Sequence, residues 1–172
     1  MLQRDKYRLA LLAACALALH GFERLIPSPI PWLRFGFANI ITLITLVVYG
    51  FNAALTITLV RVLMGSMLIG TFLGPPFIMS LVGGCFSVVA MWIALRVRVF
   101  GPLGLSLTGA LFHNIGQLLA VYAVFIQNLR SIAVLAPVIL FIGTLAGLLN
   151  GIAVIFIMEH LKKMPDNVQN TL

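Results

Sequence analysis

The chain has 172 residues, of which 62% are hydrophobic and only 9% are charged, and its mean hydropathy is +1.13. No water-soluble fold has enough interior to hide so much apolar surface, so the composition excludes a soluble domain or a soluble enzyme. The formal net charge of +7 comes from basic residues scattered among apolar runs, which argues against a nucleic-acid-binding surface.

The apolar runs are long and do not alternate with polar residues, which favours membrane-spanning helices over membrane strands. Proline and glycine divide the runs, as in the segment with Pro27, Pro29 and Pro31 and in the turn at Gly74. We therefore predict an all-α polytopic membrane protein, a single transmembrane domain over residues 1–172. Its bundle of six transmembrane helices covers residues 7–22, 33–50, 53–70, 77–95, 103–126 and 131–158.

The first helix follows a basic start and superficially resembles a signal peptide. No small-residue cleavage site follows it, so we expect it to be retained. Positively charged loops stay in the cytoplasm, which predicts the orientation of the bundle. Both termini are expected in the cytoplasm of a bacterial plasma membrane, because one side of a six-helix bundle holds most of the basic residues: Arg4, Lys6, Arg8, Arg96, Arg98, Lys162 and Lys163.

Arg61 is the most informative residue, because it lies near the middle of the third predicted helix. An arginine at the bilayer centre costs about 2.5 to 3.5 kcal/mol on insertion scales, so its side chain is expected to face the bundle interior or a wet cavity. Three interpretations stay open. Glu23 folds inward to pair with the guanidinium, backbone carbonyls and polar side chains satisfy it, or an anionic ligand completes the pair.

The fifth predicted helix carries a polar stripe. Residues on one face recur three or four positions apart: Ser106, Ala110, His113, Gln117 and Ala120. Asn114 flanks this stripe, and three polar side chains within one and a half turns indicate a lined cavity. A lone histidine inside a membrane is more often a packing residue. On other helices, Thr58, Arg61 and Gly65 share a face, and Asn39 and Thr42 stand near Arg34.

Small residues predict close helix contacts. Gly143, Gly147 and Gly151 form two overlapping G-x-x-x-G units, which we expect to serve internal packing. In the first helix, Ala10, Ala14 and Ala18 form a similar ridge. For this ridge, internal packing and docking of another membrane protein both stay open.

The sequence holds no Walker motif, nucleophile elbow or paired-carboxylate motif, and we expect no catalytic residue, metal site or cofactor. Cys15 and Cys85 lie in separate apolar runs, so neither a disulfide nor a metal site is expected. A haem held by His20 and His113 is disfavoured, since these residues are expected at different depths.

Four segments carry a resemblance to a known family: Arg34-Phe-Gly-Phe-Ala-Asn-Ile-Ile-Thr-Leu43, Arg61-Val-Leu-Met-Gly65, Ser80-Leu-Val-Gly-Gly84 and Gly109-Ala-Leu-Phe-His-Asn-Ile-Gly-Gln117. The chain resembles the family called heptaprenyl diphosphate synthase component I, or Gx transporter. That family is similar in layout to the substrate-binding S components of energy-coupling-factor (ECF) transporters, which are six-helix bundles that dock on a transmembrane T component with two ATPases.

This resemblance implies that the alanine ridge is a docking face for the T component. It also implies a ligand pocket that opens outward, with six residues facing it: Arg34, Asn39, Arg61, His113, Asn114 and Gln117. The enzymatic family name conflicts with the composition, because prenyl transfer needs aspartate-rich magnesium sites and Asp5 and Asp166 are the only aspartates.

The sequence thus favours a non-catalytic, substrate-capturing subunit of a small-molecule uptake transporter, with a small anionic or polar-headed ligand. Two alternatives stay open. One is a non-catalytic membrane subunit of an isoprenoid or quinone-linked enzyme complex, and the other is a stand-alone proton-coupled carrier that uses His113.

Overall fold

The computed structural model describes residues 3–23 and 36–163, with side chains described for residues 6–23 and 36–160. This part of the chain forms helices and no strands. The helices are α1 (Gln3–Glu23), α2 (Ala38–Tyr49), α3 (Phe51–Leu68), α4 (Pro75–Val97), α5 (Pro102–Val124) and α6 (Leu129–Lys163). The all-α prediction is confirmed for these residues.

Four of the helices, α3 to α6, are long and apolar enough to cross a membrane. The remaining two differ from them. Helix α1 has 21 residues but carries charged side chains near both ends, and α2 has only 12 residues. At 1.5 Å per residue, α2 rises about 18 Å, which is short of the roughly 30 Å of a bilayer's hydrocarbon core. The structure therefore supports a membrane protein, whereas the count of six spanning helices stays a prediction.

Most helix limits lie within about three residues of the predicted ones. Helix α1 begins at Gln3 rather than at residue 7, and α2 and α6 are the larger exceptions. The prediction of helix over residues 33–50 is wrong for Gly36, Phe37 and Gly50, and residues 33–35 lie outside the described part. Gly36 and Gly50 have φ angles of 73° and 84°, a left-handed conformation that ends a helix and that glycine adopts without strain. At the other exception, α6 continues to Lys163 rather than ending at residue 158.

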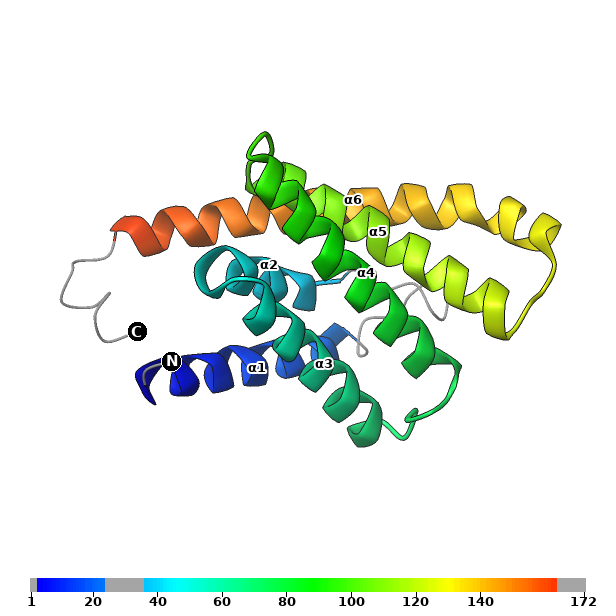
Figure 1. Ribbon diagram of the computed structural model, residues 1–172, viewed down its shortest axis with the longest axis horizontal. Coiled ribbons are helices and arrows are strands. Elements are labelled where there is room, and N and C mark those ends of the chain that lie inside the picture. Colours follow the sequence, from blue (N-terminus) through cyan, green and yellow to red (C-terminus); the bar gives the residue numbers. More distant parts are fainter. Residues whose placement is uncertain (1–2, 24–35, 164–172) are drawn as a thin grey trace.

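Prolines and turns start the long helices. Pro75 and Pro102 stand in the first turns of α4 and α5, where the missing N–H has no helical partner to lose. The turn between α3 and α4 holds Gly70 and Leu73 at positive φ and is closed by the Thr71 N–H donating to the Ser66 carbonyl at 2.9 Å. These turns reverse the chain, so consecutive helices run in opposite directions (Figure 1).

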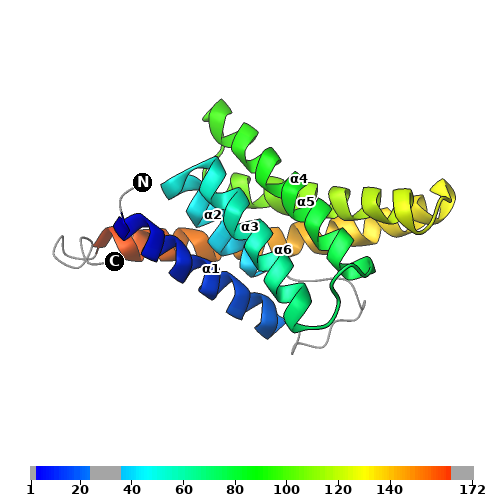
Figure 2. The same cartoon turned by 60° about the horizontal axis from the view of Figure 1, so that its bottom comes forward.

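Helices α4, α5 and α6 pack side by side in chain order, and α1 packs against α2 and α3 (Figures 1 and 2). The short helix α2 contacts all five other helices. The beginning of α1 and the end of α6 lie at the same end of the molecule, together with the turn between α2 and α3 (Figure 1). An even number of crossings would produce this arrangement, which agrees with both termini on one side.

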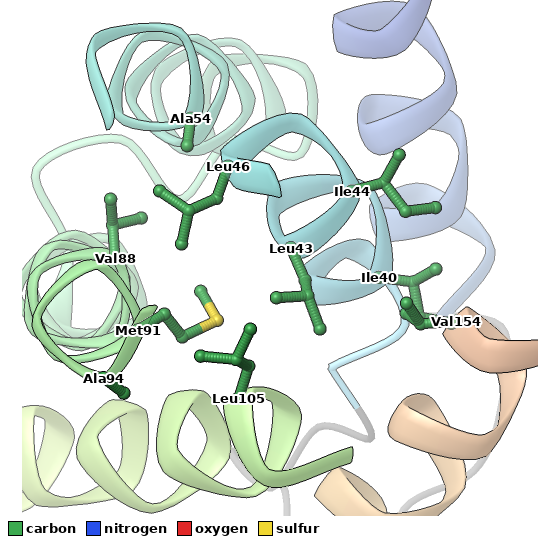
Figure 3. Packing of buried hydrophobic residues seen from close by; sticks show 10 residues of the cluster. All are labelled: Ile40, Leu43, Ile44, Leu46, Ala54, Val88, Met91, Ala94, Leu105 and Val154. Carbon is green, nitrogen blue, oxygen red and sulfur yellow. The ribbon is translucent and has the colours of Figure 1, made fainter. Parts of the chain in front are cut away.

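The apolar core is built around α2. Leu43 and Leu46 of this helix are 1% exposed and meet Met91 of α4 and Leu105 of α5 (Figure 3). Val154 of α6 joins the same cluster next to Ile40. Because lipid tails are as apolar as leucine, such a core holds helices together by van der Waals packing more than by escape from water.

Glycines bring α6 into close contact with α5, a partner that the predicted internal packing did not name. A Cβ atom on Gly147 would lie 2.6 Å from the Ala110 methyl group, and one on Gly151 would lie 2.7 Å from a Leu103 methyl group. Gly143 faces Asn114 in the same way. The internal-packing interpretation of the two G-x-x-x-G units is therefore confirmed.

Candidate functional site

Arg61 lies inside the bundle. It is the eleventh of the 18 residues of α3, and its side chain is 5% exposed. Gly84 of the neighbouring helix α4 lies close to it: an added Cβ there would be in ordinary contact with Arg61 Nη2 at 4.0 Å and only 2.8 Å from Thr58 Cγ2, so the glycine makes room for Thr58. The expectation that this arginine faces the interior, and not lipid, is confirmed.

Hydroxyl and amide groups of α2, α3 and α4 extend the polar surroundings of Arg61. The hydroxyls of Thr42 and Thr58 lie 3.4 Å apart in a hydrogen bond between α2 and α3, and both side chains are buried. Asn39 of α2 donates from Nδ2 to the Ser87 hydroxyl of α4 at 3.4 Å. Hydrogen bonds of this kind offset the cost of burying polar groups among apolar helices.

On the α5 side, His113 and Gln117 form a pair whose Nε2 atoms lie 3.1 Å apart. Helix α4 again provides the space with a glycine. A Cβ on Gly83 would lie 2.8 Å from the His113 carbonyl oxygen, 3.0 Å from Gln117 Cγ and 3.2 Å from His113 Cε1. Because an amide nitrogen only donates, Gln117 donates and His113 Nε2 accepts in this arrangement.

Two adjacent glycines of α4 thus face different partners. Gly84 faces Thr58 and Arg61 of α3, and Gly83 faces His113 and Gln117 of α5. We call the region formed by Asn39, Thr42, Thr58, Arg61, Gly83, Gly84, Ser87, His113 and Gln117 the polar belt. It combines one positive charge with hydroxyl, amide and imidazole groups, which suits recognition of an anionic or strongly polar group.

Asn114 and Ser106 do not join the polar belt, although the sequence grouped them with His113 and Gln117. Asn114 donates to the Ile139 carbonyl at 3.5 Å, and Ser106 donates to the Gly147 carbonyl at 2.8 Å, so both side chains face α6. The predicted stripe is divided because α5 packs between α4 and α6 and presents polar side chains to both. Arg34, the remaining predicted site residue, lies outside the described residues.

Glu23 holds the start of α2. The residue is 7% exposed, and its carboxylate accepts a hydrogen bond from the Phe37 N–H at 2.9 Å. A helix N-terminus carries unsatisfied N–H groups and a partial positive charge, so a carboxylate is well placed there. Asn150 of α6 donates to the Gly36 carbonyl at 3.1 Å and fixes the same junction. Asn150 is not among the predicted site residues, although an asparagine inside an apolar run was a usable signal.

The alanine ridge lies on the surface. Ala10, Ala14 and Ala18 are all exposed, so the internal-packing interpretation of the ridge is wrong. Ala10 and Ala14 line a groove of about 840 Å³ between α1 and α3, whose far wall includes Asn52 and Thr56. The backbone of another helix approaches most closely where side chains are small, so this surface is suited to such a contact.

The described residues include no group of three or more His, Cys, Asp or Glu side chains placed to hold a metal ion. The fold and the polar belt together define a class: a polytopic helical membrane protein with a charged, hydrogen-bonding interior.

A family comparison narrows this class. The family model described as heptaprenyl diphosphate synthase component I matches residues 12–157, and the chain belongs to this family. The predicted family resemblance is thereby confirmed. No curated protein and no solved structure shows a significant match to the chain.

Proposed function

We propose that this protein is the membrane-embedded, substrate-binding subunit of a small-molecule uptake transporter, similar in layout to an ECF S component. The observation that carries the proposal is the polar belt, in which a buried guanidinium and an imidazole–amide pair lie on two sides of α4. Charged residues inside a membrane bundle mark substrate or ion pathways more often than they serve packing. The ligand would be small and anionic or polar-headed.

In this proposal the protein has no catalytic role of its own. A partner supplies the energy, and the exposed ridge of Ala10, Ala14 and Ala18 beside the groove between α1 and α3 is the docking face for a T component with two ATPases. The protein would reside in the bacterial plasma membrane with both termini in the cytoplasm, and it would capture its ligand from the outer side.

The test compares native mass spectra of the gently purified wild-type protein and of three variants. Arg61→Ala removes the buried charge, Arg61→Lys keeps it, and Arg130→Ala removes an exposed arginine as the matched control. We expect the wild type and Arg130→Ala to carry the same small molecule, Arg61→Lys to carry less of it, and Arg61→Ala to carry none. An Arg61→Ala protein that folds and retains the molecule in full would contradict the proposal.

The family description favours a second candidate, a non-catalytic membrane subunit of a heptaprenyl diphosphate or quinone-linked enzyme complex. The two candidates predict different partners in the same purification. Transport predicts two ATPases and a transmembrane T component, whereas the enzyme complex predicts a prenyltransferase. Mass spectrometry of the intact complex, repeated with Ala14→Leu to block the ridge, identifies the partner and tests its docking face together.

A further inference from the structure

A groove of about 640 Å³ runs along the outside of the bundle, between the second half of α4 and the first half of α5. These two helices pack side by side (Figure 1). The α4 wall consists of side chains three or four positions apart that are 40% to 57% exposed: Phe86, Val89, Ile93 and Val97. Because α4 is long and apolar enough to cross a membrane, this exposed face meets lipid.

The lining of the groove is apolar. The Thr108 hydroxyl, on the α5 wall, donates to the Gly104 carbonyl at 2.8 Å and is therefore satisfied within its own helix. Phe100 lies against α5 at one end of the groove, where a Cβ on Gly104 would come within 2.9 Å of its ring. Such a lining suits a hydrocarbon chain.

The length of the groove matches one leaflet of a bilayer. Cys85 and Val97, at the two ends of the α4 wall, are 12 residues apart. A helix rises 1.5 Å per residue, so this wall is about 18 Å long, close to the roughly 15 Å that each leaflet contributes to the hydrocarbon core. The end of the groove at Val97 and Phe100 therefore lies at the level of the lipid headgroups.

Two exposed arginines stand at this end, because Arg96 precedes Val97 and Arg98 follows it. Arg96 comes seven residues after Val89 of the groove wall, which places both on one side of α4. Its guanidinium carbon lies 4.6 Å from the centre of the Trp92 ring. Stacking of this kind holds the guanidinium over the ring face and leaves the N–H groups at its edge able to donate. Tryptophan is itself enriched at the headgroup level of membranes.

The charge at this end calls for an anion. Helix α4, helix α5 and the turn between them contain no aspartate or glutamate, so the hairpin supplies no carboxylate to Arg96 or Arg98. The donor fork of arginine matches the geometry of phosphate oxygens. In the proposed orientation this end faces the cytoplasm, and basic sites between helices on that side are suited to anionic headgroups.

We propose that the groove between α4 and α5 binds an anionic phospholipid of the surrounding bilayer. One acyl chain lies against Val89 and Ile93, and Arg96 and Arg98 bind the phosphate. A cavity of about 150 Å³ holds benzene, so by simple scaling 640 Å³ has room for about two dozen carbon atoms, enough for an acyl chain. This site is separate from the polar belt, and it does not depend on the proposed function.

Two lipids with identical chains test the headgroup chemistry: dioleoyl phosphatidylglycerol, which is anionic, and dioleoyl phosphatidylcholine, which has no net charge. Each is titrated into the delipidated protein in detergent, and native mass spectrometry counts the bound lipids. We expect the wild type to bind the anionic lipid about 25-fold more tightly, since each arginine near an anionic headgroup contributes about fivefold. Equal affinities for the two lipids would overturn the inference.

Variants of the two arginines identify the groups that bind the phosphate. The double variant Arg96→Gln/Arg98→Gln should bind both lipids with equal affinity, whereas Arg96→Lys/Arg98→Lys, which keeps the charges, should retain most of the preference. Arg130→Gln is the matched control, because it removes an exposed arginine from the first turn of α6, away from the groove. If the glutamine double variant keeps the full preference, these arginines do not bind the headgroup and the inference fails.

Variants of the groove wall test the place. Val89→Trp and Ile93→Trp each fill the groove from an exposed position, and Val138→Trp adds the same indole to α6 at a residue that is 50% exposed and does not line the groove. We expect the first two to weaken binding of the anionic lipid at least tenfold and the third to leave it unchanged. If both groove variants bind this lipid as the wild type does, the groove is not the site. A co-purifying polypeptide that only the groove variants lose would make the groove a protein contact, and the inference would fail as well.

Discussion

Replacing Gly83 by alanine should push α4 and α5 apart. The added Cβ would lie 2.8 Å from the His113 carbonyl oxygen, about 0.6 Å closer than an ordinary contact at 3.4 Å. A backbone oxygen in a helix cannot turn away as a flexible side chain can. The helices themselves must shift, and this movement also disturbs the His113–Gln117 pair.

The expected change in the free energy of unfolding follows from two opposing effects. Overpacking a tight contact costs about 1 to 3 kcal/mol, whereas alanine is better than glycine by about 0.8 to 1 kcal/mol in a helix interior. We therefore expect Gly83→Ala to lower the free energy of unfolding by up to about 2 kcal/mol. Gly21 is the matched control, because it lies in helix α1 and an added Cβ would meet no atom within 4 Å. Gly21→Ala should be neutral or stabilise the protein by up to about 1 kcal/mol.

The assay is reversible unfolding in mixed micelles, followed by circular dichroism as the denaturing detergent increases. The two variants make the same chemical change, so the difference between their unfolding free energies isolates the contact between α4 and α5. If Gly83→Ala proves as stable as Gly21→Ala, the close approach of these helices is not as described, and the arrangement of the polar belt must be revised.

Three further predictions concern other contacts. Ser106→Ala removes the hydroxyl that donates to the Gly147 carbonyl at 2.8 Å, so it should destabilise the protein by about 1 kcal/mol in the same assay; no loss would show that this bond contributes nothing. Glu23→Gln keeps an acceptor for the N–H at the start of α2 but removes the charge, so it should lower the free energy of unfolding by about 0.3 to 1 kcal/mol. Glu23→Ala removes the acceptor as well and should lower it further. If both variants are as stable as the wild type, the capping role is contradicted. The third prediction uses a protein whose two native cysteines are replaced. In it, Phe72→Cys should react with a membrane-impermeant thiol reagent added outside intact cells, and Val99→Cys should not. Labelling of Val99→Cys and not of Phe72→Cys would invert the proposed orientation.

The helical character of the chain was readable from the sequence because an apolar run can cross lipid only if each backbone N–H and C=O is satisfied within its own segment. The interior position of Arg61 was readable for a related reason, since exposure of a guanidinium to hydrocarbon is costly. The role of Gly143, Gly147 and Gly151 also followed from spacing alone, because a ridge of missing side chains allows a close neighbour.

The tertiary structure decided which faces meet. In a membrane protein the lipid is as apolar as the core, so hydrophobic periodicity does not say which side of a helix points inward. Ser106, Asn114, His113 and Gln117 all lie on α5. Because α5 packs between α4 and α6, Ser106 and Asn114 face α6, whereas His113 and Gln117 pair with each other beside α4. The surface position of the alanine ridge was open in the sequence for the same reason.

The central place of α2 was likewise beyond the sequence. Its residues predict a helix, but its short length depends on Gly36 and Gly50 adopting left-handed conformations and on Glu23 and Asn150 holding its first turn. The last two side chains come from α1 and α6, and Asn150 is 114 residues from its hydrogen-bond partner. Local sequence fixes which segments are helical, whereas contacts between distant segments determine where a helix begins, what it faces and where a cavity is left between them.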